Sequence, residues 1–230
     1  MKKISLILVA FTLLLTGCGN QQEKMEIITD QYTEKGVEVK FPQLSNMTDE
    51  TKEQRLNKLI KDEALRIIAY YDQNFTNRVI EVEYKVTYQS EDVLSVQYFG
   101  YFSAEDVAHP TNIFYTSNID LQKEKVLVLK DLIEVNQDLV TLFRNGQYVP
   151  LDSGLNLENE GLYNIMMERF TDEELLTYFQ NADHLDESNI SNVYSYLKED
   201  TLGISIGIPH ALGDHMEVEM KVEGIANRIK

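Results

Sequence analysis

The stretch Ile80–Tyr88, which reads IEVEYKVTY, decides the fold class. Apolar residues alternate there with charged or polar ones, and successive side chains of a strand point to opposite faces. The stretch therefore predicts a strand with one wet face and one buried face, on which both Ile80 and Tyr88 lie. Such alternation is typical of an antiparallel sheet. A polar turn at residues 89–92 and an apolar return over Leu94–Tyr98 predict a hairpin.

Patterns on either side of this hairpin complete the fold prediction. Similar signals predict strands at Val37–Phe41, Ile113–Leu121, Val126–Leu129, Gly203–Ile208 and Met216–Val222. Helical spacing or capping residues predict helices after Thr48, after Asp131, around Tyr163–Phe170 and after Thr171. This order predicts an α+β fold, mainly an antiparallel sheet with helices packed on one side. We expect an N-terminal module at 36–122 and a C-terminal module at 123–230, which form either separate domains or one compact unit.

The N-terminus carries an export signal. Lys2 and Lys3 precede the apolar run Ile4–Leu15, which is shorter than the about 20 residues that span a bilayer. Small residues follow, and the order of the three parts is typical of a secretory signal. We therefore expect residues 1–17 to be a signal peptide.

The end of this signal, Leu15-Thr16-Gly17-Cys18, resembles the lipobox of bacterial lipoproteins. The resemblance implies that Cys18, the single cysteine, becomes the acylated N-terminus at the outer face of the cell membrane. Residues 18–35 then read as a flexible polar tether. The alternative is an ordinary secreted protein with an incidental free cysteine.

The net charge of −17 limits the partners. Nucleic acid binding requires a basic face that displaces counterions, so we expect no nucleic acid partner. Direct adsorption to anionic lipid is disfavoured for the same reason. A cationic protein would be attracted, although an acidic surface also serves solubility alone.

Several segments together resemble a known pair of modules. They include Ser95–Tyr101, Ala108-His109-Pro110, Asn118–Leu121, Leu127–Leu132 and Ile208–Gly213. In this order they resemble the paired uncharacterised modules, DUF4163-like and DUF3298-like, of RsiV-type anti-sigma factor ectodomains and some peptidoglycan deacetylases. The resemblance covers residues 36–225. It implies an extracytoplasmic module that faces the cell wall and, in the anti-sigma members, recognises lysozyme. Asp106-Val107 stand where the family often has a glycine pair.

No catalytic or metal-binding motif is found. There is no Gly-x-Ser-x-Gly elbow, although a Ser-His-Asp group that meets only in space remains open. His210 and His215 lack metal-ligand spacing and are interpreted as turn residues. The acidic groups at 49–50 and 172–174 suit helix N-termini, and the group at 183–187 suits a solvated loop. We expect no catalytic residues, no metal and no cofactor.

Aromatic residues mark the candidate ligand site. If Tyr98 faces the core, then Phe99 and Tyr101 face outward, next to the loop that carries His109. Exposed rings of this kind suit recognition of sugar or protein. The alternatives are a strand buried on both faces and a histidine that only shapes its loop.

These inferences lead to one hypothesis and two rivals. The hypothesis is a non-enzymatic, lipid-anchored binding protein that recognises a basic muramidase of the lysozyme type, or a wall component such as glycan. The first rival is a cell-wall hydrolase. The second is a small-molecule receptor for a transporter, which is disfavoured because two alternating lobes are not visible in the sequence.

Overall fold

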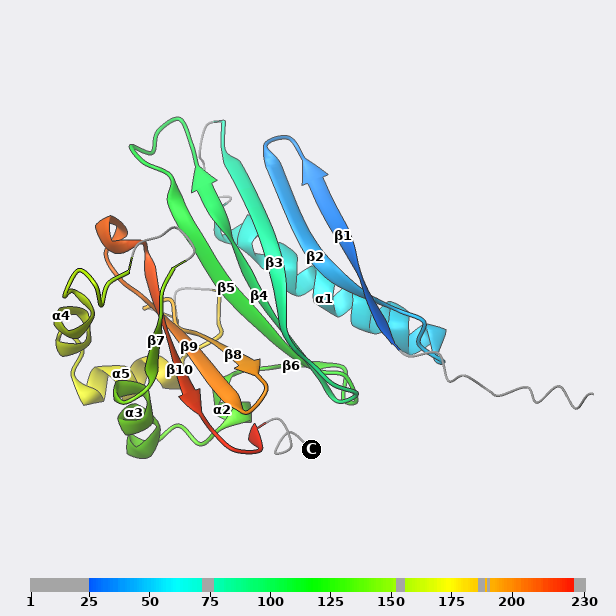
Figure 1. Ribbon diagram of the computed structural model, residues 1–230. Helices are drawn as coiled ribbons and strands as arrows, with labels where there is room; N and C mark the ends of the chain where they lie inside the picture. The colour runs from blue at the N-terminus through cyan, green and yellow to red at the C-terminus, as the bar shows by residue number, and fades with distance from the viewer. Residues whose placement is uncertain (1–24, 72–76, 152–155, 186–188, 190, 226–230) are drawn as a thin grey trace, which may run out of the picture.

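The computed structural model describes residues 25–71, 77–151, 156–185, 189 and 191–225 (Figure 1). The predicted signal peptide, residues 1–17, and the predicted lipidation site, Cys18, lie outside the described residues. Within the described ranges, none of the helices has the length and apolar character needed to cross a membrane.

Six strands form a sheet, here called the large sheet, in the first half of the chain. In spatial and chain order they are β1 (Glu26–Glu34), β2 (Val37–Ser45), β3 (Val79–Gln89), β4 (Val93–Ser103), β5 (Thr111–Asp120) and β6 (Lys125–Leu127). Neighbours are antiparallel except for β2 and β3, which are parallel. Parallel neighbours need a crossover connection, and helix α1 (Glu50–Tyr70) lies within it.

Helix α1 covers one face of the large sheet. The Asp49 carboxylate, which follows Thr48 directly, caps it by accepting a hydrogen bond from the Lys52 N–H at 2.9 Å. Its buried residues recur at helical spacing and are Leu56, Ile60, Ala64 and Ile67. The Tyr115 hydroxyl of β5 donates to the Ala64 carbonyl at 2.5 Å, which ties the helix to the sheet.

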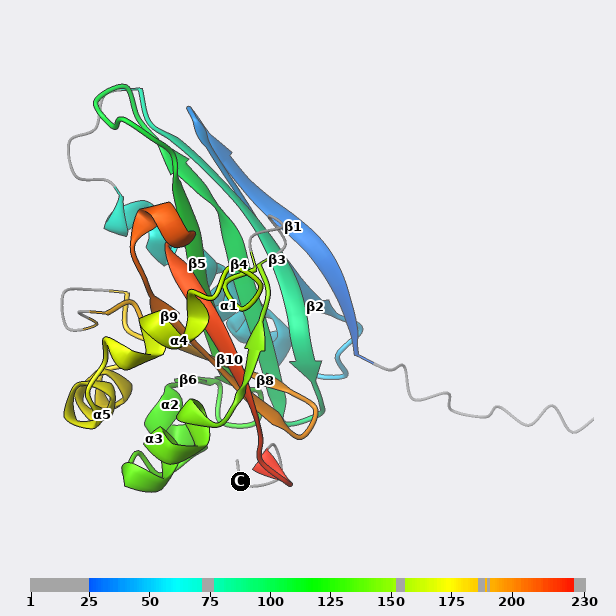
Figure 2. The same cartoon turned by 60° about the vertical axis from the view of Figure 1, so that its left-hand side comes forward.

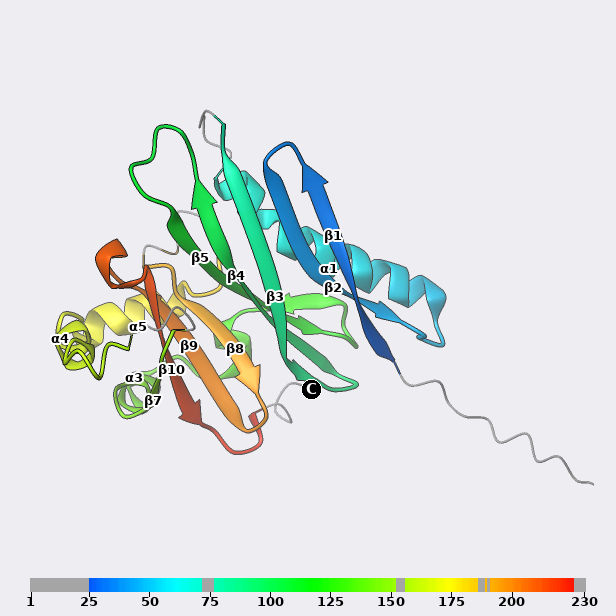
Figure 3. The same cartoon turned by 45° about the horizontal axis from the view of Figure 1, so that its top comes forward.

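The second half of the chain builds a small sheet with its own helices. The helices are α2 (Leu129–Leu132), α3 (Gln137–Arg144), α4 (Tyr163–Glu168) and α5 (Asp172–Gln180). The strands are β7 (Gln147–Val149), β8 (Tyr194–Lys198), β9 (Thr201–Gly207) and β10 (His215–Lys221), and a short 3-10 turn, η1 (His210–Leu212), precedes β10. All pairs are antiparallel, in the spatial order β7-β10-β9-β8. Helices α3, α4 and α5 lie beside this sheet (Figure 3).

The small sheet stands with its β8 edge against the large sheet, on the face opposite α1 (Figure 2). The edge strand of a sheet has unpaired backbone N–H and C=O groups. Polar side chains of the large sheet form hydrogen bonds with these groups of β8. Thr116 Oγ1 and Asn118 Nδ2 donate to the Ser195 carbonyl at 2.6 and 2.9 Å. The Leu197 N–H donates to Ser95 Oγ at 2.9 Å. The two halves therefore form one packed unit.

This architecture confirms the predicted α+β class with mainly antiparallel pairing. It holds two sheets instead of one, and the large sheet has α1 on one face and the small sheet on the other. The predicted boundary after residue 122 falls between β5 and β6, so that β6 completes the large sheet.

The tether prediction at residues 18–35 is wrong over Glu26–Glu34, which form β1. This strand pairs with β2 along its whole length, and Ile27 and Tyr32 pack against the core. Backbone pairing and these apolar contacts thus order a segment whose composition is mostly polar.

The predicted direction of Tyr88 is also wrong. The pairing of β3 with β4 shifts between Val86 and Tyr88, which leaves Thr87 as an extra residue. A bulge of this kind turns the following side chain to the other face. Tyr88 therefore packs against the core of the small sheet, whereas Ile80 packs under α1.

Candidate functional site

A cleft of about 390 Å³ opens between the large sheet and the small sheet. The large sheet contributes side chains of β3, β4 and β5, including Lys85, Gln97, Phe99, Tyr101 and Phe114. The small sheet contributes side chains of β8 and β10, including Tyr196, Lys198, His215, Glu217 and Glu219. The volume of the cleft lies within the range of about 300–1,000 Å³ that is usual for small-molecule sites.

Phe99 and Tyr101 lie together on the cleft side of β4. Phe99 is 38% exposed, because it alternates with the buried Tyr98, which faces α1. The Tyr101 hydroxyl donates a hydrogen bond to Glu81, and this carboxylate raises the pKa of Tyr101. Lower on the same face, Gln97 is buried under the small sheet. The end of β4 with Phe99 and Tyr101 therefore carries exposed rings, whereas the part around Gln97 is buried on both faces.

The floor of the cleft is a buried polar pair. Gln97 Nε2 donates to Glu217 Oε2 at 2.9 Å, and the two residues are only 8% and 9% exposed. The Tyr196 hydroxyl donates to Glu219 Oε1 at 3.2 Å. Burial and the two carboxylates raise the pKa of Tyr196 above its usual range. Strand alternation places Glu217 and Glu219 on one face of β10, with their Cα atoms about 7 Å apart.

His215 forms part of the wall of the cleft. Its ring stacks on Phe114 with 4.5 Å between ring centroids, and its Nε2 lies 3.7 Å from Glu217 Oε1. Its Nδ1 is buried and has no hydrogen-bond partner among the described residues. The interpretation of His215 as a turn residue missed this position. The alternation over Met216–Val222 could have indicated it, because extending that alternation back by one residue places His215 on the same face as Glu217 and Glu219.

His109 lies outside the lining of the cleft. It sits in the loop between β4 and β5, and its ring stacks near that of His210 with 6.1 Å between centroids. His210 Nδ1 lies 2.9 Å from Asp214 Oδ1, and the Asp214 carboxylate accepts from the Asn112 N–H at 2.8 Å. His109 is thus placed at a second contact between the halves, next to the cleft.

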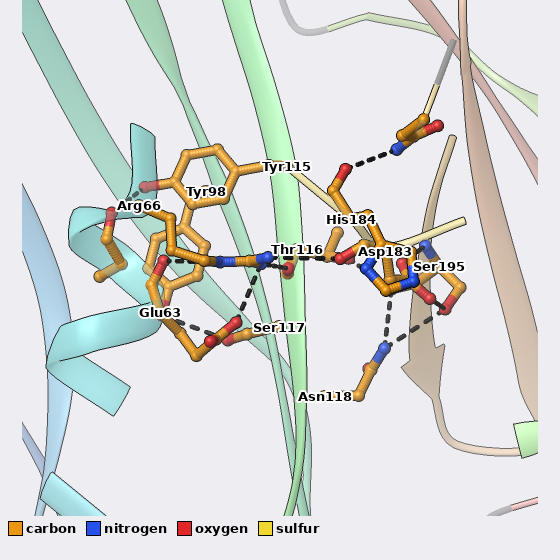
Figure 4. A network of polar contacts seen from close by, with 12 residues as sticks. Glu63, Arg66, Tyr98, Tyr115, Thr116, Ser117, Asn118, Asp183, His184 and Ser195 are labelled. Carbon is orange, nitrogen blue, oxygen red and sulfur yellow. Dashed lines mark hydrogen bonds and ion pairs between the residues drawn. The ribbon is translucent and has the colours of Figure 1, made fainter. Parts of the chain in front are cut away.

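A buried polar network fixes the small sheet in position (Figure 4). Asp183 accepts hydrogen bonds from the Ser195 N–H and hydroxyl at 2.6 and 2.7 Å and from the Leu129 N–H at 2.6 Å. Arg66 of α1 donates to the carbonyls of Asp183 and Thr116 at 3.3 and 3.4 Å. Asp183 is 4% exposed, which contradicts our expectation of a solvated loop at 183–187. Burial raises its pKa to about 6, against the lowering effect of the bonds from Ser195 and Leu129.

Across the described ranges, no cluster of three or more histidine, cysteine or acidic side chains is arranged to hold a metal ion.

No family model matches this chain, and neither does any curated protein. Two solved structures of DUF3298 family proteins are similar to it. The one from Bacteroides fragilis has 14% sequence identity and a TM-score of 0.49, over 87% of this chain and 90% of the other. The one from Pseudomonas aeruginosa has 12% identity and a TM-score of 0.46, over 90% and 91%. The structural neighbours are thus DUF3298 family proteins at low identity, and they carry no argument about activity.

Proposed function

We propose that this protein is a lipid-anchored, extracytoplasmic binding protein that captures a wall-directed ligand without turning it over. In its sharpest form the ligand is a basic muramidase of the lysozyme type. The observation that carries the proposal is the exposed Phe99 ring at an inter-sheet cleft, on a protein with a net charge of −17. The lipobox-like end of the signal at Cys18 supports the location.

The surroundings of Phe99 suit a basic partner. The register of β3 and β4 places Glu83 opposite Phe99 and Glu81 opposite Tyr101. Directly opposite residues share one face of a sheet, so each ring has a carboxylate beside it, of which Glu83 is also paired with Lys40. An arginine or lysine side chain combines an apolar stem with a cationic end and complements such a pair.

The proposed mechanism has two steps. The negative field of the protein first attracts the cationic enzyme, which raises the association rate and makes it depend on salt. Phe99 and Tyr101 then provide the short-range contact that slows dissociation. The resemblance to paired DUF4163-like and DUF3298-like modules of RsiV-type proteins supports the same class of partner. We propose that this protein is related to those modules through the sequence segments that carry the resemblance.

Binding of the purified protein to a basic lysozyme, measured at low and at physiological salt, tests this function. We expect saturable binding that weakens with salt, and a loss of about tenfold or more in affinity for Phe99→Ala. Leu142→Ala is the matched control, because Leu142 is 41% exposed on α3, away from the cleft. Absence of binding at both salt concentrations would overturn the muramidase as ligand.

One observation favours a second candidate, a cell-wall hydrolase. Glu217 and Glu219 line the same cleft from one face of β10, and a pair of carboxyl groups is what most glycoside hydrolases use. Release of soluble fragments from purified wall by the wild type, lost in both Glu217→Gln and Glu219→Gln, would support it. Equal release by the wild type and both variants would rule it out.

A further inference from the structure

We propose that the floor of the inter-sheet cleft binds an uncharged saccharide through its pyranose rings. This inference rests on the proposed binding role of Phe99 and Tyr101 and deepens it, because it adds the charges and hydrogen-bonding groups at the floor of the cleft.

The charge of the lining favours a neutral ligand. The lining includes two carboxylates, Glu217 and Glu219, and two ammonium groups, Lys85 and Lys198. Lys198 Nζ lies 3.0 Å from Glu219 Oε1, so part of this charge is paired within the cleft itself. A strongly charged ligand would meet as much repulsion as attraction there. The site thus differs from the molecule as a whole, which is acidic.

Aromatic rings line the large-sheet wall of the cleft. Phe99, Tyr101 and Phe114 come from that sheet, whereas the Tyr196 ring of the small sheet is only 1% exposed. The face of an aromatic ring is electron-rich and attracts the polarised C–H groups on one side of a pyranose ring. Phe99 is exposed, and Phe114 is held in place by its stacking on His215. A flat, partly apolar ligand therefore finds preformed surfaces.

The floor offers fixed hydrogen-bonding groups below these rings. A carboxylate has about four lone-pair sites. After their contacts with Gln97, His215, Tyr196 and Lys198, Glu217 and Glu219 retain acceptors for ligand hydroxyls. The buried bond between Gln97 and Glu217 holds one of these carboxylates in a fixed orientation. Rings on one wall with paired polar groups below match the alternating C–H and hydroxyl surfaces of a sugar.

Titration of the purified full-length protein with N-acetylglucosamine oligosaccharides, from monomer to hexamer, tests the inference by calorimetry. We expect saturable binding that strengthens with chain length and is unchanged between low and physiological salt. Phe99→Ala and Glu217→Gln should each weaken it about tenfold or more, equivalent to about 1.4 kcal/mol. Leu142→Ala should leave it unchanged. Phe99→Ala changes an exposed side chain, so it tests the site even if the buried Glu217→Gln variant misfolds.

Three outcomes would overturn the inference: no binding at millimolar oligosaccharide, binding that both cleft variants retain, or binding that weakens steeply with salt. The muramidase assay is read separately. Lysozyme binding without oligosaccharide binding would overturn the saccharide site alone, and the reverse result would overturn the muramidase alone.

Discussion

Asn118 of the large sheet bonds the backbone of Ser195 in the small sheet, with 2.9 Å between Asn118 Nδ2 and the Ser195 carbonyl oxygen. The same amide accepts a hydrogen bond from Ser95 Oγ at 2.7 Å through Oδ1. Asn118 thus helps Thr116 and Ser95 to hold the edge of the small sheet against the face of the large sheet.

Replacement of Asn118 should loosen this joint. Asn118→Ala leaves the Ser195 carbonyl with fewer donors and creates a cavity, and we expect a loss of about 2–3 kcal/mol in the free energy of unfolding. Urea unfolding measures it. Asn181→Ala serves as the control, because that half-buried amide bonds the Thr177 carbonyl of its own helix. Equal losses in the two variants would contradict the role of Asn118.

Acidification should stabilise the protein through Asp183. Its pKa is raised from 3.8 to about 6 in the folded state. A raised folded pKa means that the folded state binds the proton more tightly, so stability is lost as the pH rises through 6 and is regained on acidification. One pKa unit corresponds to about 1.4 kcal/mol, which gives a change of order 1–3 kcal/mol, most of it between pH 7 and pH 4.

Comparison with Asp183→Asn isolates this effect, because the variant has no carboxyl to titrate. Urea unfolding at pH 7 and pH 5 should show a smaller gain on acidification in Asp183→Asn than in the wild type. The partly buried Glu63, whose pKa burial also raises, is present in both proteins and cancels. An identical gain in the two proteins would show that Asp183 does not titrate in this range.

The start of α5 should depend on its capping box. Thr171 Oγ1 accepts from the Glu174 N–H at 3.2 Å, and Glu174 Oε2 accepts from the Thr171 N–H at 2.8 Å. Thr171→Ala should cost about 1 kcal/mol of unfolding free energy. Thr177→Ala, in the middle of the same helix, should change it by less than about 0.5 kcal/mol. Thermal unfolding that ranks the two variants the other way would contradict the capping role.

A methyl group at Gly100 should separate β3 from β4. A Cβ at this position would lie 1.8 Å from the Glu81 carbonyl oxygen, and backbone atoms cannot move aside as a side chain can. We expect Gly100→Ala to lose about 3 kcal/mol or more. Gly161→Ala is the comparison, because nothing lies within 4 Å of its Cβ and the change costs only the strain of a φ of +69°. About 1 kcal/mol is expected there.

The membrane anchor predicts a simple fractionation result. Metabolic labelling with a fatty acid should mark the wild type, and Cys18→Ala should abolish both the label and recovery with membranes, since two acyl chains are what makes attachment stable. An unlabelled wild type in the soluble fraction would overturn the anchor and the proposed location together.

Much of the large sheet could be predicted from alternation, because β3, β4 and β5 each bury one face under α1. Strand β1 could not be predicted, since an exposed edge strand such as Glu26–Glu34 has little apolar pattern. Nor could β8, whose backbone is bonded by side chains that are distant in sequence. The bulge at Thr87 leaves no signal in composition, so alternation alone places Tyr88 on the wrong face.

Alternation could predict only part of the candidate site, because it indicates which face of a strand a side chain is on and not what packs against that face. The alternation at Phe99 and Tyr101 gave the direction of their side chains correctly, because the core under α1 fixes that face of β4. Alternation also separated Glu217 and Glu219 from the apolar face of β10. It could not show that their polar face turns toward the large sheet instead of solvent, because packing between sheets depends on contacts far apart in the chain.

The start of β1 at Glu26 has a consequence for reach. If Cys18 holds two acyl chains, roughly eight residues join the lipid to the first strand, and even fully stretched they span no more than about 28 Å. The folded part would then stay close to the membrane surface, with little freedom to move away from it or to rotate. Any large partner would have to come to it from the side that faces away from the headgroups.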